Sequence, residues 1–400
     1  MSTGLRDLAR QRLWRRWTLA SFLARLPGTM TLLALVLAGE EATGSLAVGA
    51  QLAGVATVVA GVAAPWRGRR LDRAELRGGL QRACLATGAV FLAQALALAL
   101  DAPVWALFAL AAVQGVAFAA ISGGFRALLV PVVPPEDLAR ANTMEAVFVE
   151  VAFVAGPTLA GLLGLVVGAR GVLLAMAAAS FASVLVARRL PHLQPAVGRP
   201  SAAPWRVPAA RAVFGLGLSL GVCVGLFESA LPARAAELGF QAASGGLLLA
   251  FTSIGSAAGG LFAAGQRDAL AHVRGQACAL LVAFALLLVP VAAAGNVWWL
   301  GAALLLAGVP IAPLNALGSL VLQQAVPPGR QAEGFAVYIA AILVGAGLGN
   351  GLTGLLLDDI GAQALLLLSV VLPLAAAAAV GAAVLRRGRS DRSRAMAGLG

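Results

Sequence analysis

The chain has 400 residues, of which 60% are hydrophobic and only 12% are charged, and its mean hydropathy is +0.91. A soluble domain usually carries about 25% charged residues. The apolar residues also fall in long blocks instead of at amphipathic spacing, which excludes a single soluble globule, a disordered chain and a disulfide scaffold. The composition therefore predicts an all-α polytopic membrane protein whose apolar surface is covered by lipid.

The formal net charge of +12 comes from 29 basic residues, all of which are arginine. These arginines lie almost entirely between the apolar blocks, so the charge indicates membrane topology and not a nucleic-acid partner. Cys84, Cys223 and Cys278 all fall inside apolar blocks. An odd number of cysteines within a bilayer argues against a disulfide framework.

A helix that crosses a bilayer needs roughly 20 mostly apolar residues. Blocks of about that length predict twelve spans, which in chain order are 17–38, 45–65, 80–100, 104–126, 142–168, 171–187, 211–232, 242–264, 275–294, 297–322, 334–357 and 362–385. When these spans alternate in direction, 26 of the 29 arginines fall on the side that holds both chain ends. The positive-inside rule then predicts cytoplasmic termini. Abundant Ala, Gly and Arg without Lys fits a GC-rich bacterial genome, so we expect a bacterial inner membrane.

An internal repeat appears when the chain is shifted by 193 residues. The shift aligns Val133–Pro135 with a second Val-Pro-Pro at 326–328 and Gly168 with Gly361. It also moves each span by six helices, an even number, so the two halves keep the same orientation. The sequence thus predicts two parallel six-helix bundles, residues 1–187 and 211–400, joined by a proline-rich cytoplasmic linker at 188–210.

The loop after the second span carries a recognisable motif. Gly68, Asp72, Arg73 and Arg77 match the GxxxDRxGRR signature between helices two and three of the major facilitator superfamily, which the chain resembles. Glu75 stands where that signature usually has its second glycine. The resemblance implies the twelve-helix fold of that family, and it gives Gly68, Asp72 and Arg73 a role in latching the outward-facing state.

Two further motifs lie inside spans five and four. Gly156 and Pro157 resemble the end of the GPxxGG motif of exporters in this superfamily, where proline bends the helix and small residues allow close packing. The alternative is generic small-residue packing. Span four keeps Gln114 and Gly115 of an RxxQG motif found in proton-coupled exporters, but Ala111 replaces its arginine.

Ionised groups inside a bilayer are costly, at about 2.5–3.5 kcal/mol each on insertion scales, so each needs a reason. We expect Arg25 and Glu150 to lie at similar depth on neighbouring helices, either as a structural ion pair or as a substrate or proton site. Arg126 ends span four. Glu145 lies nearer the membrane surface, where we expect it to be solvated.

Glu228 has no evident partner at its level in span seven, and an isolated carboxylate in an apolar setting favours its protonated form. This property suits a group that takes up and releases protons. The alternative is that Glu228 faces an outer vestibule. Asn315 follows Pro310 and Pro313, so we expect span ten to be broken near mid-membrane and to offer free backbone groups.

Enzyme signatures are absent from the sequence. His192 and His272 lie in loops, and there is no metal-ligand spacing, phosphate loop or ATP-binding domain. We therefore expect no catalytic residue, no metal and no cofactor. Transport must then depend on ion gradients or on substrate concentration.

The resemblance and the apolar interior together predict a monomeric secondary transporter. We expect it to export a hydrophobic or amphipathic small molecule, such as a drug or secondary metabolite, in exchange for protons. Its partners are the small-molecule substrate, protons and membrane lipids. The alternatives are a nutrient uniporter or symporter, and a lipid flippase or membrane sensor. The predicted substrate and coupling residues are Arg25, Gln114, Arg126, Glu150, Glu228 and Asn315.

Overall fold

A computed structural model describes residues 10–72, 75–119, 121–129, 131–134, 138–192, 206–264, 273–326 and 331–397. Within these ranges the regular structure is entirely helical. In chain order the helices are α2 (Arg12–Thr43), α3 (Leu46–Asp72), α4 (Leu76–Ala99), α5 (Val104–Phe118), α6 (Ile121–Ala127), α7 (Leu138–Ala187), α8 (Pro208–Glu237), the 3₁₀ turn η3 (Ala242–Ser244), α9 (Gly245–Ala264), α10 (Val273–Ala292), α11 (Val297–Gly308), α12 (Ile311–Ala325) and α13 (Gln331–Ala397). The prediction of an all-α membrane protein is confirmed.

Ten segments of the described chain are long and apolar enough to cross a membrane. Two of them, Val147–Ala187 in α7 and Gly334–Val380 in α13, contain 41 and 47 residues. A straight helix of 41 residues would be about 60 Å long, which is roughly twice the thickness of a hydrocarbon core. Both segments must therefore change direction.

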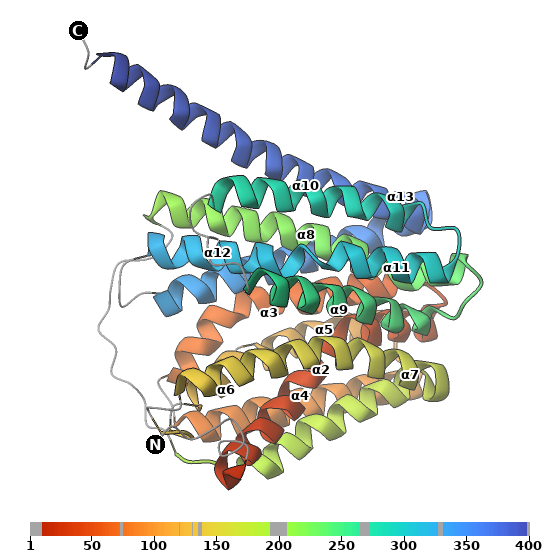
Figure 1. Cartoon of the computed structure of the whole chain (residues 1–400). Helices are drawn as coiled ribbons and strands as arrows, with labels where there is room; N and C mark the ends of the chain where they lie inside the picture. The colour runs from red at the N-terminus through yellow and green to blue at the C-terminus, as the bar shows by residue number, and fades with distance from the viewer. Residues whose placement is uncertain are drawn as a thin grey trace.

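The change of direction occurs at one glycine in each helix. Gly168 in α7 has φ 67° and ψ −175°, and Gly361 in α13 has φ 76° and ψ 166°. This region of backbone space is essentially restricted to glycine. Figure 1 shows α7 and α13 each reaching one side of the molecule and coming back as a second helix.

The two reversals are also held by the same kind of contact. Glu41 Oε2 accepts a hydrogen bond from the backbone N–H of Ala169 at 3.1 Å, and Glu237 Oε1 accepts one from that of Ala362 at 2.8 Å. Each carboxylate comes from the end of an earlier helix, α2 or α8. The glycine pair aligned by the 193-residue repeat thus shares its backbone conformation and its capping group.

The two ends of the molecule differ in charge. At the basic end, α2 begins, α3 ends and α4 begins, and the exposed side chains there include Arg12, Arg69 and Arg82. At the acidic end, α2 and α8 finish near Glu40 and Glu237. Helix α13 also ends on the side where α2 begins, on the left of Figure 1.

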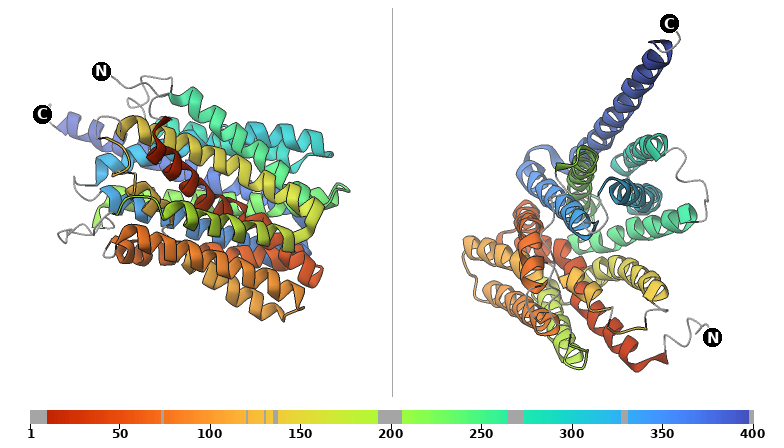
Figure 2. Two further views of the ribbon diagram at one scale, coloured as in Figure 1. Left: turned by 90° about the horizontal axis from the view of Figure 1, so that it is seen from below. Right: turned by 90° about the vertical axis from the view of Figure 1, so that its left-hand side faces the viewer.

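The helices form two groups. Seen along their axes, the N-terminal group (α2–α7) lies on one side of the molecule and the C-terminal group (α8–α13) on the other (Figure 2, right). The largest buried cluster comes almost wholly from the C-terminal group and includes Phe227 and Phe284, whereas a second cluster comes mainly from the N-terminal group and includes Phe91. The groups meet chiefly where α3 lies against α13 and α7 against α9. We call this boundary the seam.

Two of the apolar spans are broken into shorter helices. Helix α11 ends at Gly308 and α12 begins at Ile311, so span ten is interrupted near Pro310 as predicted, although Val309 and Pro310 keep helical φ and ψ angles. Span four is also interrupted, because Ala119 adopts an extended conformation (φ −54°, ψ 133°) between α5 and α6. Breaks of this kind leave backbone groups free at membrane depth, which is tolerated only where protein or water can satisfy them.

Candidate functional site

A buried ion cluster joins three helices of the N-terminal group. Arg25 Nη2 on α2 lies 2.6 Å from Glu145 Oε1 on α7, and it also donates to the carbonyl of Ser122 on α6 at 3.0 Å. Arg126 Nε on α6 lies 2.8 Å from the other carboxylate oxygen, Glu145 Oε2. A single carboxylate therefore ties α7 to both helices.

The three side chains differ strongly in exposure. Only 1% of the Glu145 side chain and 9% of the Arg25 side chain are exposed, whereas 61% of the Arg126 side chain is exposed. With two guanidinium groups for one carboxylate, the cluster carries one excess positive charge. Of the two guanidinium groups, the one that solvent reaches belongs to Arg126.

This cluster corrects the expectation for Glu145, which is buried and not solvated. The depth estimate failed because Glu145 is near the beginning of α7 and the long Arg25 side chain reaches back to it. We also expected Glu150 at this level. Its side chain lies outside the described residues, so a role for Glu150 remains a prediction.

The C-terminal group has a neutral counterpart of this cluster. The 193-residue offset places Tyr338 at the position of Glu145, and Asn315 at that of Ser122. The Tyr338 hydroxyl lies 3.4 Å from Asn315 Oδ1, so the pair links α13 to α12 as Glu145 links α7 to α6. Tyr338 is the single tyrosine of the chain, and the repeat could have identified it.

Gln114 belongs to a chain of polar side chains across α4, α5 and α2. Gln94 Nε2 donates to Gln114 Oε1 at 2.9 Å, and Gln114 Nε2 donates to Thr31 Oγ1 at 3.1 Å. Thr31 in turn donates to the carbonyl of Pro27 at 3.0 Å. Gln94 and Gln114 are buried. The chain holds three helices together in the manner of interhelical polar contacts in membranes.

Glu228 lies on α8, one turn before Pro232. Its side chain is half-buried, and it makes no hydrogen bond or ion pair with any part of the chain that the structure describes. By contrast, Glu237 on the same helix is paired, with its Oε2 2.7 Å from Arg234 Nη1. The expectation that Glu228 lacks a partner at its level agrees with these contacts.

The motif expected in a loop begins within α3, because Gly68 to Asp72 are helical, and it is described only in part. An added Cβ at Gly68 would meet nothing within 4 Å, so this glycine is not required by close packing in the present conformation. The side chain of Asp72 and the whole of Arg73 lie outside the described residues. Their predicted latching role stays a prediction.

Glu75, the departure from the family signature, has a clear structural task. Its carboxylate accepts from the backbone N–H groups of Arg77 at 3.2 Å and Gly78 at 2.7 Å, so it caps the beginning of α4. The same carboxylate lies 3.1 Å from His192 Nδ1, and Arg77 contacts His192. These contacts connect α4 to the segment after α7. The available signal for the cap was an acidic residue a few positions before the predicted span 80–100.

Gly156 and Pro157 lie where α7 crosses α2 and α9. A Cβ at Gly156 would overlap the side chain of Thr29, and a Cβ at Gly246 would overlap the carbonyl oxygen of Pro157. Close approach of helix backbones therefore explains the small residues here. Gly349, the repeat partner of Gly156, packs in the same way against the backbone of α8.

The seam itself contains two matched crossings. A Cβ at Gly161 on α7 would lie 2.8 Å from the carbonyl oxygen of Ala243, and a Cβ at Gly354 on α13 would overlap Ala47 and Gln51 on α3. Gln51 Nε2 also donates to the carbonyl of Gly354 at 2.8 Å. Gly161 and Gly354 are related by the repeat, so each group contacts the other through the equivalent helix.

An opening of about 390 Å³ lies at the acidic end, where the two groups meet. Glu40 and Ser45 contribute to it from the N-terminal group, and Glu237 and Asp358 from the C-terminal group. Three carboxylates thus surround the mouth of the seam at this end.

Comparisons with known proteins agree on the family and the fold. A family model described as the Major Facilitator Superfamily matches residues 17–265 and 213–397. The nucleoside transporter NupG is 16% identical over 93% of this chain and 99% of its own, with a TM-score of 0.73. The human organic anion transporter MFSD10 is 15% identical over 92% and 98%, with a TM-score of 0.64. The POT family transporter PepTSo is 10% identical over 94% and 98%, with a TM-score of 0.75.

Comparison with curated proteins gives no significant match. At identities this low the solved structures show a shared fold and carry no information on the substrate of this chain.

Proposed function

The chain belongs to the major facilitator superfamily, whose members are transporters and not enzymes, and we propose that it exports a hydrophobic or amphipathic small molecule in exchange for protons. The proposal places the path between two halves of six spans, residues 1–187 and 211–400, joined by 188–210. The ten candidate spans become twelve when α7 and α13, which each contain two helices, are counted as two crossings each.

The observation that supports this mechanism most is the matched pair of seam crossings. Gly161 packs on the beginning of α9, and Gly354 packs on the beginning of α3. Both contacts are nearer the acidic end, and in both a glycine lets the helices approach closely, with the Gln51 amide as a hydrogen-bond donor across the second crossing. Two bundles joined in this way can rock about the seam, which is the motion that alternating access requires. In the proposal, Gly68, Asp72, Arg73, Gly156 and Pro157 control that motion.

The charge distribution supports an orientation for the proposed exporter. Because cytoplasmic loops carry an excess of arginine, we assign the basic end to the cytoplasm, with both termini there. Two arginines outside the basic end are each neutralised locally, since Arg170 pairs with Glu41 and Arg234 with Glu237. Their pairing agrees with this assignment. The absence of lysine and the richness in alanine and glycine favour a bacterial inner membrane.

Few charged groups lie at membrane depth, which favours a lipophilic cargo over sugars or phosphorylated compounds. We assign proton coupling to Glu228, whose carboxylate has no partner in the described chain. Substrate contacts in this proposal come from Arg25, Gln114, Arg126, Glu150 and Asn315. One proton moving through 100 mV supplies about 2.3 kcal/mol, which sustains a roughly forty-fold gradient of cargo.

The proposal is tested by transport into proteoliposomes with an acidic interior, using a panel of lipophilic fluorescent dyes. We expect dye accumulation that depends on the protein and is abolished by a protonophore. Dye levels equal to those of protein-free liposomes across the panel would contradict export of lipophilic compounds.

Glu228→Gln provides the test of coupling, because it keeps the size of the side chain and removes the titratable group. We expect this variant to fold and to lose accumulation driven by the proton gradient. Asp359→Asn is the matched control, since Asp359 is an exposed carboxylate at the acidic end. Full gradient-driven transport in Glu228→Gln would exclude Glu228 from coupling.

A further inference from the structure

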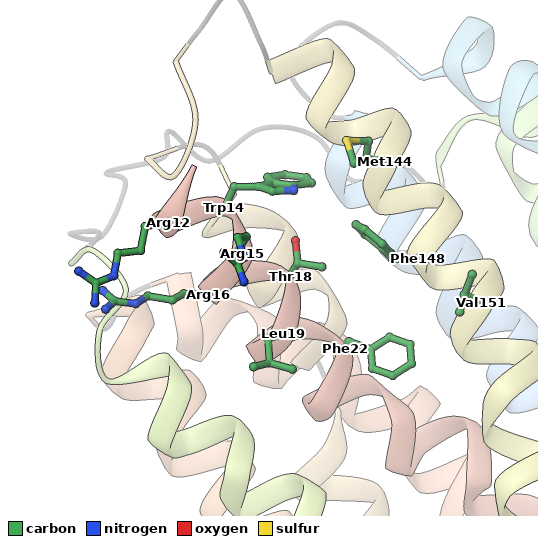
Figure 3. A pocket seen from close by; sticks show the side chains of 10 residues that line it. All are labelled: Arg12, Trp14, Arg15, Arg16, Thr18, Leu19, Phe22, Met144, Phe148 and Val151. Atoms are coloured by element: carbon green, nitrogen blue, oxygen red, sulfur yellow. The ribbon is translucent and has the colours of Figure 1, made fainter. Parts of the chain in front are cut away.

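A groove of about 810 Å³ opens between α2 and α7 at the basic end (Figure 3). Its walls are mainly apolar, with Phe22 on α2 opposite Phe148 and Val151 on α7 (Figure 3). Leu19 and Val151 are 50% and 46% exposed. In a membrane protein, apolar side chains left open at this depth are covered by acyl chains.

The groove has a charged mouth. Arg12, Arg15 and Arg16 line it at the beginning of α2, where Figure 3 shows Arg12 and Arg16 side by side and Arg15 next to Thr18. None of the three forms an ion pair with a residue that the structure describes. Guanidinium groups match phosphate oxygens in both charge and geometry, so this mouth suits a phosphate group.

The dimensions of the groove fit one membrane leaflet. From Arg12 to Phe22 the helix rises by about 15 Å at 1.5 Å per residue, which is half of a hydrocarbon core of about 30 Å. The charged mouth and the apolar walls are therefore separated as the headgroup and the acyl chains of a phospholipid are.

We propose that this groove is a binding site for an anionic phospholipid of the leaflet at the basic end. The headgroup phosphate lies among Arg12, Arg15 and Arg16, and an acyl chain runs along Phe148 and Val151. A small soluble anion would use the mouth alone, and a neutral lipid would use the walls alone. The site makes no assumption about transport, so its test is a binding measurement.

The test is native mass spectrometry of the full chain titrated with phosphatidylglycerol and, separately, with phosphatidylcholine. We expect one phosphatidylglycerol to bind in preference to phosphatidylcholine. An arginine near an anionic lipid contributes about fivefold in affinity. The triple variant R12Q/R15Q/R16Q is therefore expected to bind phosphatidylglycerol roughly a hundred-fold more weakly.

Two further variants separate the mouth from the walls. The control R69Q/R82Q/R211Q removes three exposed arginines from the same end outside the groove, and we expect it to bind as the wild type does. Val151→Trp fills the groove and leaves every charge, and we expect it to weaken binding at least tenfold. Equal loss in both triple variants, or unchanged binding in Val151→Trp, would overturn the proposal.

Discussion

The ion cluster of Arg25, Glu145 and Arg126 makes a quantitative prediction, because one carboxylate has two arginine partners in different environments. Glu145→Gln leaves the buried Arg25 guanidinium without its anionic partner, because the Gln amide oxygen and the Ser122 carbonyl are both neutral acceptors. Removing one partner of a buried ion pair typically costs about 3–5 kcal/mol, since an uncompensated charge remains. We expect a loss of that size in the free energy of unfolding.

Arg126→Gln is the matched comparison. It breaks an ion pair of similar length, 2.8 Å against 2.6 Å, but the Arg126 side chain is 61% exposed and Glu145 keeps Arg25 as a partner. Exposed ion pairs contribute about 0–1 kcal/mol. The double variant R25Q/E145Q removes both buried charges together, so we expect it to be more stable than Glu145→Gln alone.

The assay is unfolding of the purified variants in mixed detergent micelles, followed by SDS titration and by thermal denaturation. The expected order of stability is wild type, Arg126→Gln, R25Q/E145Q and then Glu145→Gln. Equal losses for Arg126→Gln and Glu145→Gln would refute the reasoning from burial. A double variant R25Q/E145Q that is no more stable than Glu145→Gln would show that Arg25 and Glu145 do not act as a pair.

Three smaller predictions concern helix packing and reversal. Gly349→Val is expected to lower the free energy of unfolding by about 1–3 kcal/mol, because its side chain would overlap the backbone of α8. Gly351→Val should be tolerated, because a Cβ there meets nothing within 4 Å. Equal thermal stability of the two variants would contradict this prediction. Gly168→Ala should lower the free energy of unfolding by about 1–3 kcal/mol, because φ is 67° at this residue and alanine would be strained there. An unchanged melting temperature would show that the backbone at residue 168 does not require glycine. Gln114→Leu removes the acceptor of Gln94 and the donor to Thr31, so we expect a loss of about 1 kcal/mol in the free energy of unfolding, measured by SDS titration. A gain in stability would contradict a stabilising role for this chain of polar side chains.

The sequence predicted the apolar spans and the break in span ten because both depend on local composition. It also predicted that residues 168 and 361 are equivalent, since the repeat aligns them. The left-handed backbone at those glycines and their carboxylate caps could not be read from composition, because the caps come from Glu41 and Glu237, over a hundred residues earlier.

The site was harder to predict than the fold. Counting residues from the membrane surface treats helices as straight and perpendicular, and that treatment left Glu145 at the surface when it is buried beside Arg25. Helix tilt and the reach of arginine decide the pairing, and neither is visible in one sequence. The capping of α4 by Glu75 was not predicted, although an acidic residue before a helix is a local signal that the sequence contains.

The central claim is that the two groups of helices separate at the acidic end during transport. The most direct test is a reversible disulfide cross-link at that end. A Cβ added at Gly164 would lie 3.1 Å from the Cβ of Ala243, close to the 3.5–4.5 Å typical of a disulfide.

The control is Ser183→Cys with native Cys84, because Cys84 Sγ and Ser183 Oγ lie 4.0 Å apart within the N-terminal group. We predict that oxidation abolishes transport in G164C/A243C, that reduction restores it, and that the control transports in both states. Undiminished transport by fully cross-linked G164C/A243C would contradict the account.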